Sequence, residues 1–197
     1  MPDLAALLPS WRLALESERK AAGTIKNYTI GVTQFLGWCE STGTPPELSR
    51  PTVQAFTASL LAGGAEPATA VARQLALKRF SAWLCEEEEI AADALIGLRP
   101  PKVDRKVTHA LTDDDLKLLI KACHGKTLKD RRDEAIVRLM AETGMRAGEV
   151  IGLRTDDVNL TLRRVTIRRG TAGAGRITGF GPHRAAPLPR AIRARRS

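Results

Sequence analysis

The chain has 197 residues, of which 43% are hydrophobic and 4% aromatic, and its net charge is +9 with a sequence pI of about 10.0. This hydrophobic content is enough for a core, yet no apolar run approaches a membrane span, and the N-terminus lacks the regions of a signal peptide. We therefore expect a cytoplasmic protein of one large or two small domains. The three cysteines are widely spaced and form no Cys-x-x-Cys or Cys/His cluster, so neither a disulfide framework nor a zinc site is expected.

The excess of positive charge belongs to the C-terminal stretch. Of the 31 lysines and arginines, ten follow Asp157, whereas all 22 acidic residues lie at or before it. Without those ten, 21 basic residues face 22 acidic ones, a net charge of −1. Any DNA contact outside this C-terminal stretch must then come from local patches of positive charge, because the rest of the chain carries almost no net charge. The ten are Arg163, Arg164, Arg168, Arg169, Arg176, Arg184, Arg190, Arg193, Arg195 and Arg196.

Two helices are predicted at the start of the chain. The first covers residues 4–19 and carries an apolar stripe that Pro9 interrupts. The second follows a break at Gly23, with Thr24 as its N-cap, and ends at the glycine and prolines of residues 43–46.

Two further helices complete an all-helical N-terminal domain. Ser49 caps the third helix, with Pro51 in its first turn, and Leu61 is expected to face inward near its end. The fourth helix covers residues 67–85 and places Phe80 on its apolar face.

The domain boundaries follow from proline and charge. The N-terminal domain is assigned to residues 1–97. Residues 98–109 are predicted as a linker, because two consecutive prolines forbid a helix and the charged residues keep the segment in solvent. A second domain covers residues 110–182, and residues 183–197 form a basic tail.

Three consecutive aspartates follow Thr112 at the start of the second domain. Clustered carboxylates can belong to a metal site, but other spaced ligands are lacking here. Capping of a helix is the favoured interpretation, with Thr112 as N-cap and Asp115 reaching back to it. We expect neither a metal ion nor any other cofactor.

The most informative stretch of this domain is Ala141–Leu153. A helix over residues 130–143 is predicted to stop at Gly144, where a left-handed backbone conformation costs little without a Cβ. Arg146 then lies on a tight turn before a second short helix. A guanidinium held in this way can make paired hydrogen bonds to a phosphate or a carboxylate. The alternative is that Arg146 braces the turn by pairing with Glu149.

A β-hairpin is predicted next. Residues 164–168 alternate in polarity and place Val165 and Ile167 on one face of a strand. A glycine-rich turn over residues 170–175 leads to a returning strand at residues 176–178.

Several segments, spread over roughly residues 8–182, together resemble one family. Glu142–Val150, with the sequence E-T-G-M-R-A-G-E-V, is similar to the box that holds the first catalytic arginine of the tyrosine recombinases, or phage integrases. Leu111–Leu116 is similar to the opening of their catalytic domain. Segments similar to their core-binding domain are Thr24–Tyr28, Phe35–Trp38, Pro67–Arg73 and Leu77–Leu84. The resemblance implies a mainly α fold with a small β-hairpin, in which a helical core-binding (SAM-like) domain precedes a partial catalytic domain.

The resemblance also implies a role for Arg146. In this family a tyrosine hydroxyl attacks duplex DNA and forms a 3′-phosphotyrosyl link without a metal ion. Two arginines stabilise the charge on the five-coordinate phosphate, and a hairpin lysine protonates the leaving 5′ oxygen. Losing one such preorganised donor typically costs on the order of 100- to 1000-fold in rate. Arg146 matches the first of the two arginines.

The sequence departs from the family pattern at the other catalytic positions. Thr171 stands where the hairpin lysine is expected, and a threonine hydroxyl is a poor proton donor. The His-x-x-Arg box is absent, because Ala186 stands three residues after His183. The one tyrosine, Tyr28, lies on the apolar face of its helix, where core packing is the favoured interpretation. We therefore expect that the chain does not cleave DNA.

The end of the chain has an unusual composition. From Gly173 to Ser197, 18 of 25 residues are Gly, Ala, Arg or Pro, and none is Asp, Glu or Lys. One hypothesis is a truncated or out-of-frame end of an integrase gene from GC-rich DNA. The alternative is a naturally basic, disordered tail.

Duplex DNA is the partner that these features predict, with other recombinase protomers on the same DNA. The residues expected to contact DNA, near helix starts or on polar helix faces, are Thr24, Lys26, Thr69, Arg73 and Lys78. Each could equally be an ordinary solvated side chain. Two other functions remain open, namely a DNA-binding regulator that competes with an intact integrase and a helical protein-interaction module.

Overall fold

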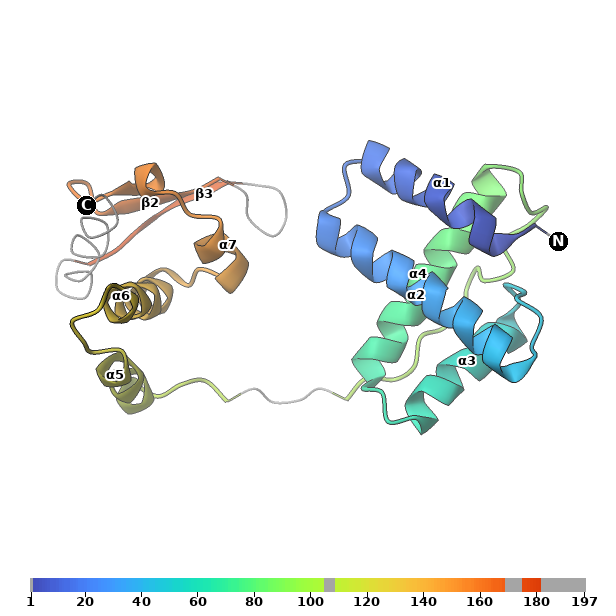
Figure 1. Ribbon diagram of the computed structural model, residues 1–197, viewed down its shortest axis with the longest axis horizontal. Helices are drawn as coiled ribbons and strands as arrows, with labels where there is room; N and C mark the ends of the chain where they lie inside the picture. Colours follow the sequence, from blue (N-terminus) through green and yellow to red (C-terminus); the bar gives the residue numbers. More distant parts are fainter. Residues whose placement is uncertain (1, 105–108, 169–174, 182–197) are drawn as a thin grey trace. The chain divides into compact units, whose positions relative to one another are not determined.

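The computed structural model describes residues 2–104, 109–168 and 175–181 (Figure 1). Two compact units divide the chain, Met1–Val107 and Thr108–Ser197, and their boundary falls inside the segment predicted as a linker. The described structure is mainly helical with a small antiparallel sheet, which confirms the predicted fold class. The tail at residues 183–197 and the position of Thr171 lie outside the described residues.

The first unit is built from helices. Helices α2 and α4 form its most extensive helix pair, while α1 packs on α2 and α3 packs on α4 (Figure 1). Their bounds are α1 Leu4–Ser17, α2 Ala22–Thr42, α3 Arg50–Ala62 and α4 Pro67–Glu86. As predicted, Ser49 caps α3, accepting a hydrogen bond from the Thr52 N–H, and Pro51 lies in the first turn.

Helix α1 continues through Pro9, as the predicted helix over residues 4–19 does, and the missing N–H of this proline removes a single hydrogen bond near the N-terminal end. Two local predictions in this unit are wrong. Helix α2 begins at Ala22 rather than after Gly23, because the carbonyl of Ala21 accepts the N–H groups of Thr24 and Ile25 at 2.8 and 3.1 Å. Thr24 therefore lies inside the first turn and is not the cap. Leu61, expected to face inward, is exposed.

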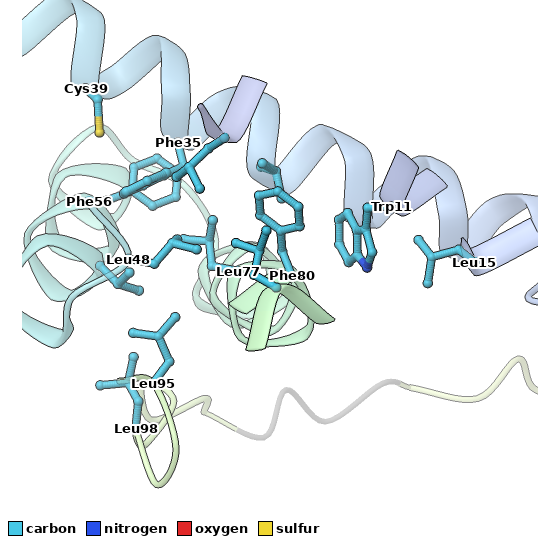
Figure 2. Close-up of a cluster of buried hydrophobic side chains, with 14 residues drawn as sticks. Trp11, Leu15, Phe35, Cys39, Leu48, Phe56, Leu77, Phe80, Leu95 and Leu98 are labelled. Carbon is cyan, nitrogen blue, oxygen red and sulfur yellow. The ribbon is translucent and has the colours of Figure 1, made fainter. Parts of the chain in front are cut away.

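A cluster of aromatic and leucine side chains forms the core of this unit (Figure 2). Phe80 of α4 is fully buried, and its ring centroid lies 4.8 Å from that of Trp11. Phe35 and Phe56 meet edge to face at 5.5 Å, which joins α2 to α3. These contacts fix the relative positions of α1, α2, α3 and α4.

The segment after α4 is tied back onto the first unit. Leu98 is buried in the core, although residues 98–109 were expected to be solvated. The Lys78 ammonium donates to the Leu98 carbonyl at 3.1 Å, and the Gln74 amide donates to the Arg99 carbonyl at 3.0 Å. Arg50 of α3 donates to the Ala94 carbonyl at 3.0 Å. The first residues assigned to the linker are therefore anchored, because these side chains satisfy their backbone carbonyls.

The second unit opens with helices that begin at capping boxes. In the first box, Thr112 accepts the Asp115 N–H at 3.1 Å while Asp115 accepts the Thr112 N–H at 3.0 Å, as predicted. A second box, at Thr127 and Asp130, was not predicted. The helices are α5 Asp113–Ala122, α6 Leu128–Thr143 and the short α7 Ala147–Ile151, followed by the 3-10 turn η1 Thr155–Asp157.

A three-stranded antiparallel sheet of order β1-β2-β3 closes this unit. The predicted strands are present as β2 Arg164–Ile167 and β3 Arg176–Gly179, and β1 Val158–Asn159 adds an edge that was not predicted. Val165 pairs with Thr178 and Ile167 with Arg176. The side chains of Val165 and Ile167 are buried against Leu139, Met145 and Phe180, so this face of the sheet carries the second core.

Apolar side chains remain exposed in the second unit. Helix α5 has no buried residue, and Leu118, Leu119 and Leu128 are exposed. The described part of this unit therefore leaves apolar surface uncovered. Within the described ranges, none of the helices is long and apolar enough to cross a membrane, and no three His, Cys, Asp or Glu side chains gather as metal ligands.

Candidate functional site

The turn between α6 and α7 places Arg146 on the surface. Helix α6 ends at Gly144, which adopts the predicted left-handed conformation with φ 63°. Its N–H donates to the Met140 carbonyl at 2.9 Å. The next side chain, Met145, is buried in the core, whereas the side chain of Arg146 is 67% exposed. A capped helix end and a buried methionine therefore fix the chain directly before the arginine.

Glu149 fixes the backbone at Arg146. Its side chain is only 4% exposed, and its Oε2 accepts the Arg146 N–H at 3.0 Å. The Arg146 guanidinium stands farther away, with Nη1 3.7 Å from Glu149 Oε1. The bracing interaction that was considered as an alternative is thus made through the backbone N–H, and the guanidinium itself makes no hydrogen bond to Glu149.

The main partner of Glu149 is Arg176, at the start of β3. Nη1 and Nη2 of Arg176 donate to Oε1 and Oε2 of Glu149 at 2.7 and 2.8 Å, a bidentate pair. This pair was not predicted from the sequence. Its only sequence signal is an arginine placed directly after the predicted glycine-rich turn.

These hydrogen bonds determine the protonation state of Glu149. The Arg176 guanidinium, followed by the Arg146 N–H, lowers the pKa of this carboxyl from 4.5 to about 2. Glu149 is therefore a carboxylate throughout the neutral range, and its charge is balanced mainly by Arg176.

We predict that the second unit loses stability in acid through this carboxyl. Because the pKa of Glu149 is lower in the folded state, its contribution is complete above pH 4.5 and declines as the pH falls toward about 2. Urea unfolding followed by circular dichroism should show wild type more stable than Glu149→Gln at pH 6, with the difference shrinking by pH 3. Asp156→Asn, at an exposed carboxyl in the 3-10 turn η1, is the control and should change little. A difference between wild type and Glu149→Gln that is constant with pH would contradict the prediction.

A second buried carboxylate orders the start of the sheet. Asp157 accepts hydrogen bonds from the Arg154 N–H at 2.9 Å and from Nε of Arg168. The Arg168 side chain, together with the Arg154 N–H, lowers the pKa of Asp157 below its ordinary value. Arg168 and Arg176 both belong to the basic C-terminal stretch, so part of its excess charge is balanced within the unit.

The residues predicted to contact DNA lie on α2 and α4, and within the described structure no hydrogen bond joins one of them to another. Arg73 Nε donates to Gln34 Oε1 at 2.6 Å, and Lys78 anchors the segment after α4. Lys26 and Thr69 are exposed, and Thr24 is half-buried. Lys26 also lines a hollow of about 330 Å³ between α1 and α2. Lys26 and Thr69 therefore remain the most accessible of the set.

Tyr28 occupies the packing position that was expected. Its ring stacks on Trp11 with centroids 5.9 Å apart and an interplanar angle of 4°. The side chain is half-buried and packs against the core of the first unit.

A helical unit followed by a unit with an arginine turn and a small sheet also occurs in proteins of known structure, and comparisons with known proteins identify the family. The family model described as "Phage integrase family" matches residues 109–195, which extends beyond residue 182, where the resemblance in the sequence analysis ended. The chain is 30% identical over 186 residues to the tyrosine recombinase XerD of Corynebacterium glutamicum. It is 28% identical over 177 residues to the tyrosine recombinase XerC of Xanthomonas campestris pv. campestris. The chain belongs to the tyrosine recombinase, or phage integrase, family.

The chain spans only part of its relatives. The alignment with XerD covers 89% of this chain and 61% of the relative, and the alignment with XerC covers 88% and 54%. The crystal structure of a λ integrase tetramer bound to a Holliday junction has the same fold, with a TM-score of 0.68 at 16% identity. That match covers 97% of this chain and 54% of the λ integrase chain.

Proposed function

We propose that this chain binds duplex DNA, with the Arg146 guanidinium contacting a backbone phosphate, and that it does not itself cleave the DNA. The exposed guanidinium on a rigid turn carries the proposal. Its side chain is 67% exposed, and the nearby carboxylate of Glu149 is already held by Arg176. A planar guanidinium with free N–H groups can form paired hydrogen bonds with phosphate oxygens.

The helical unit contributes further phosphate contacts in this proposal. Lys26 and Thr69 are exposed near the starts of α2 and α4, where N–H groups and side chains can meet phosphates. The λ integrase of similar fold was crystallised as a tetramer on a Holliday junction. By analogy with that protein, several copies of this chain would assemble on one DNA.

The absence of cleavage is proposed from the position of Tyr28. This tyrosine is the only one in the chain, and its ring stacks on Trp11 within the first unit. A nucleophilic hydroxyl must reach the phosphate that it attacks. Packing against the core holds the Tyr28 ring in place instead.

A gel shift combined with a suicide substrate tests both parts of the proposal. The full chain is incubated with duplexes from the DNA flanking its own gene, some of them nicked so that a covalent adduct would be trapped. We expect a shifted complex and no adduct that survives denaturation. A covalent adduct would overturn the proposed lack of cleavage. No shift at low salt would overturn the proposed DNA binding and favour the protein-interaction alternative.

A further inference from the structure

Arg146 and Arg176 approach the same carboxylate, but they are bound to it very differently. Arg176 makes two hydrogen bonds to Glu149, at 2.7 and 2.8 Å, whereas the closest approach of the Arg146 guanidinium is 3.7 Å. The side chain of Arg176 is 39% exposed, compared with 67% for Arg146. Arg176 is therefore hydrogen-bonded to the carboxylate, whereas the Arg146 guanidinium forms only a longer ion pair with it and keeps its N–H groups off the carboxylate oxygens.

We propose that Arg176 is a positioning residue, which occupies the Glu149 carboxylate and thereby keeps the Arg146 guanidinium available for a phosphate. This inference rests on the proposed function of Arg146. Glu149 is nearly buried and ionised, so it needs a cationic partner, because an unpaired buried carboxylate is costly. If Arg176 is removed, Arg146 is the nearest cation and only a small side-chain rotation separates it from Glu149.

The geometry explains why an arginine is needed at position 176. Its fork saturates both carboxylate oxygens at once, while Oε2 also receives the Arg146 N–H. A lysine would present a single point charge and leave one oxygen open to Arg146. Arg176→Lys should therefore have an intermediate effect.

The test measures the chemical reactivity of the Arg146 guanidinium, in the full chain and without DNA. Each variant is treated briefly with phenylglyoxal, which modifies free guanidinium groups, and the modification at Arg146 is quantified by peptide mass spectrometry. Arg131, which is exposed on α6, serves as the internal reference in the same digest. The variants are Arg176→Ala, Arg176→Lys, Glu149→Gln and the double variant Arg176→Ala/Glu149→Gln.

We expect Arg176→Ala to lower the reactivity of Arg146 relative to Arg131, and the added Glu149→Gln to restore it, because an uncharged glutamine does not capture Arg146. A purely structural role for Arg176 would loosen the turn in Arg176→Ala and would not lower the reactivity of Arg146. Unchanged reactivity of Arg146 in Arg176→Ala, or no recovery in the double variant, would overturn the inference. If circular dichroism shows that Arg176→Ala does not fold, the comparison of Arg176→Lys with wild type decides, and equal reactivity in those two proteins would overturn it.

Binding to a 30-base-pair duplex separates this inference from the proposed function. In a salt titration, Arg176→Ala should reduce the slope of log K against log salt by about 1, the value for one lost phosphate contact, and the double variant should recover it. If wild type does not bind the duplex, the proposed function fails, while the phenylglyoxal result still decides whether Arg176 keeps Arg146 free. If the double variant recovers the phenylglyoxal reactivity of Arg146 but not the slope of log K against log salt, Arg176 itself contacts DNA. Its role is then not limited to positioning, and the inference is overturned in that form.

Discussion

Replacing Phe80 with alanine is expected to lower the free energy of unfolding of the first unit by about 3–5 kcal/mol, the usual range for a large aromatic side chain in a core. Phe80 is fully buried. Its ring lies 4.8 Å from that of Trp11 and 5.9 Å from that of Trp83. Truncation therefore removes apolar contacts from two helices at once and leaves a cavity where α1 meets α4.

Tryptophan fluorescence measures this effect in the first unit alone. All three tryptophans of the chain, Trp11, Trp38 and Trp83, lie in that unit. Urea unfolding followed by fluorescence should show a large loss for Phe80→Ala. Leu75→Ala, on the same helix but 41% exposed, is the matched control and should change stability by less than roughly 1 kcal/mol. Equal effects of the two substitutions would show that Phe80 is not central to the core.

Gly31→Ala should be the second most damaging substitution, although it adds only one methyl group. A Cβ at Gly31 would lie 2.5 Å from the Cβ of Ala76 and 3.4 Å from the Arg73 carbonyl oxygen. Neither atom belongs to a flexible side chain, so α2 and α4 must move apart. Overpacking of this kind costs about 1–3 kcal/mol.

Gly37 in the same helix provides the matched control. A Cβ there meets no atom within 4 Å. Gly37→Ala should therefore stabilise the unit by about 0.5–1 kcal/mol, because alanine loses less backbone entropy than glycine in a helix. Fluorescence-monitored urea unfolding should show opposite signs for the two substitutions. The same sign for both would mean that the α2–α4 contact is not tight at Gly31.

The parts of the structure with strong local signals were predicted from the sequence. Thr112 with Asp115 marks a helix start, Gly144 marks a helix end, and alternation around Val165 marks a strand, because each signal lies within a few residues of its effect. The start of α2 was predicted wrongly because the same kind of local signal was misleading there. Thr24 resembles a cap, but the helix had already begun at Ala22.

Contacts between distant residues could not be predicted in this way. Arg176 and Glu149 are 27 residues apart, and no periodic pattern connects a residue at the start of a strand with one in a short helix. Lys78 binds the Leu98 carbonyl 20 residues away, which the charge of a lysine alone does not reveal. The sequence therefore indicates Arg146 as a candidate residue, whereas the interactions that hold its turn were found only in the structure.

The central claim is that the Arg146 guanidinium contacts a DNA phosphate, and the salt dependence of duplex binding tests it most directly. Binding of a labelled 30-base-pair duplex is followed by fluorescence anisotropy at several KCl concentrations for wild type, Arg146→Ala and Arg131→Ala. The control removes the same charge from an exposed position on α6. We predict that Arg146→Ala weakens binding and reduces the slope of log K against log salt by about 1, whereas Arg131→Ala leaves the slope near the wild-type value. An unchanged slope for Arg146→Ala, or equal changes in both variants, would contradict the account.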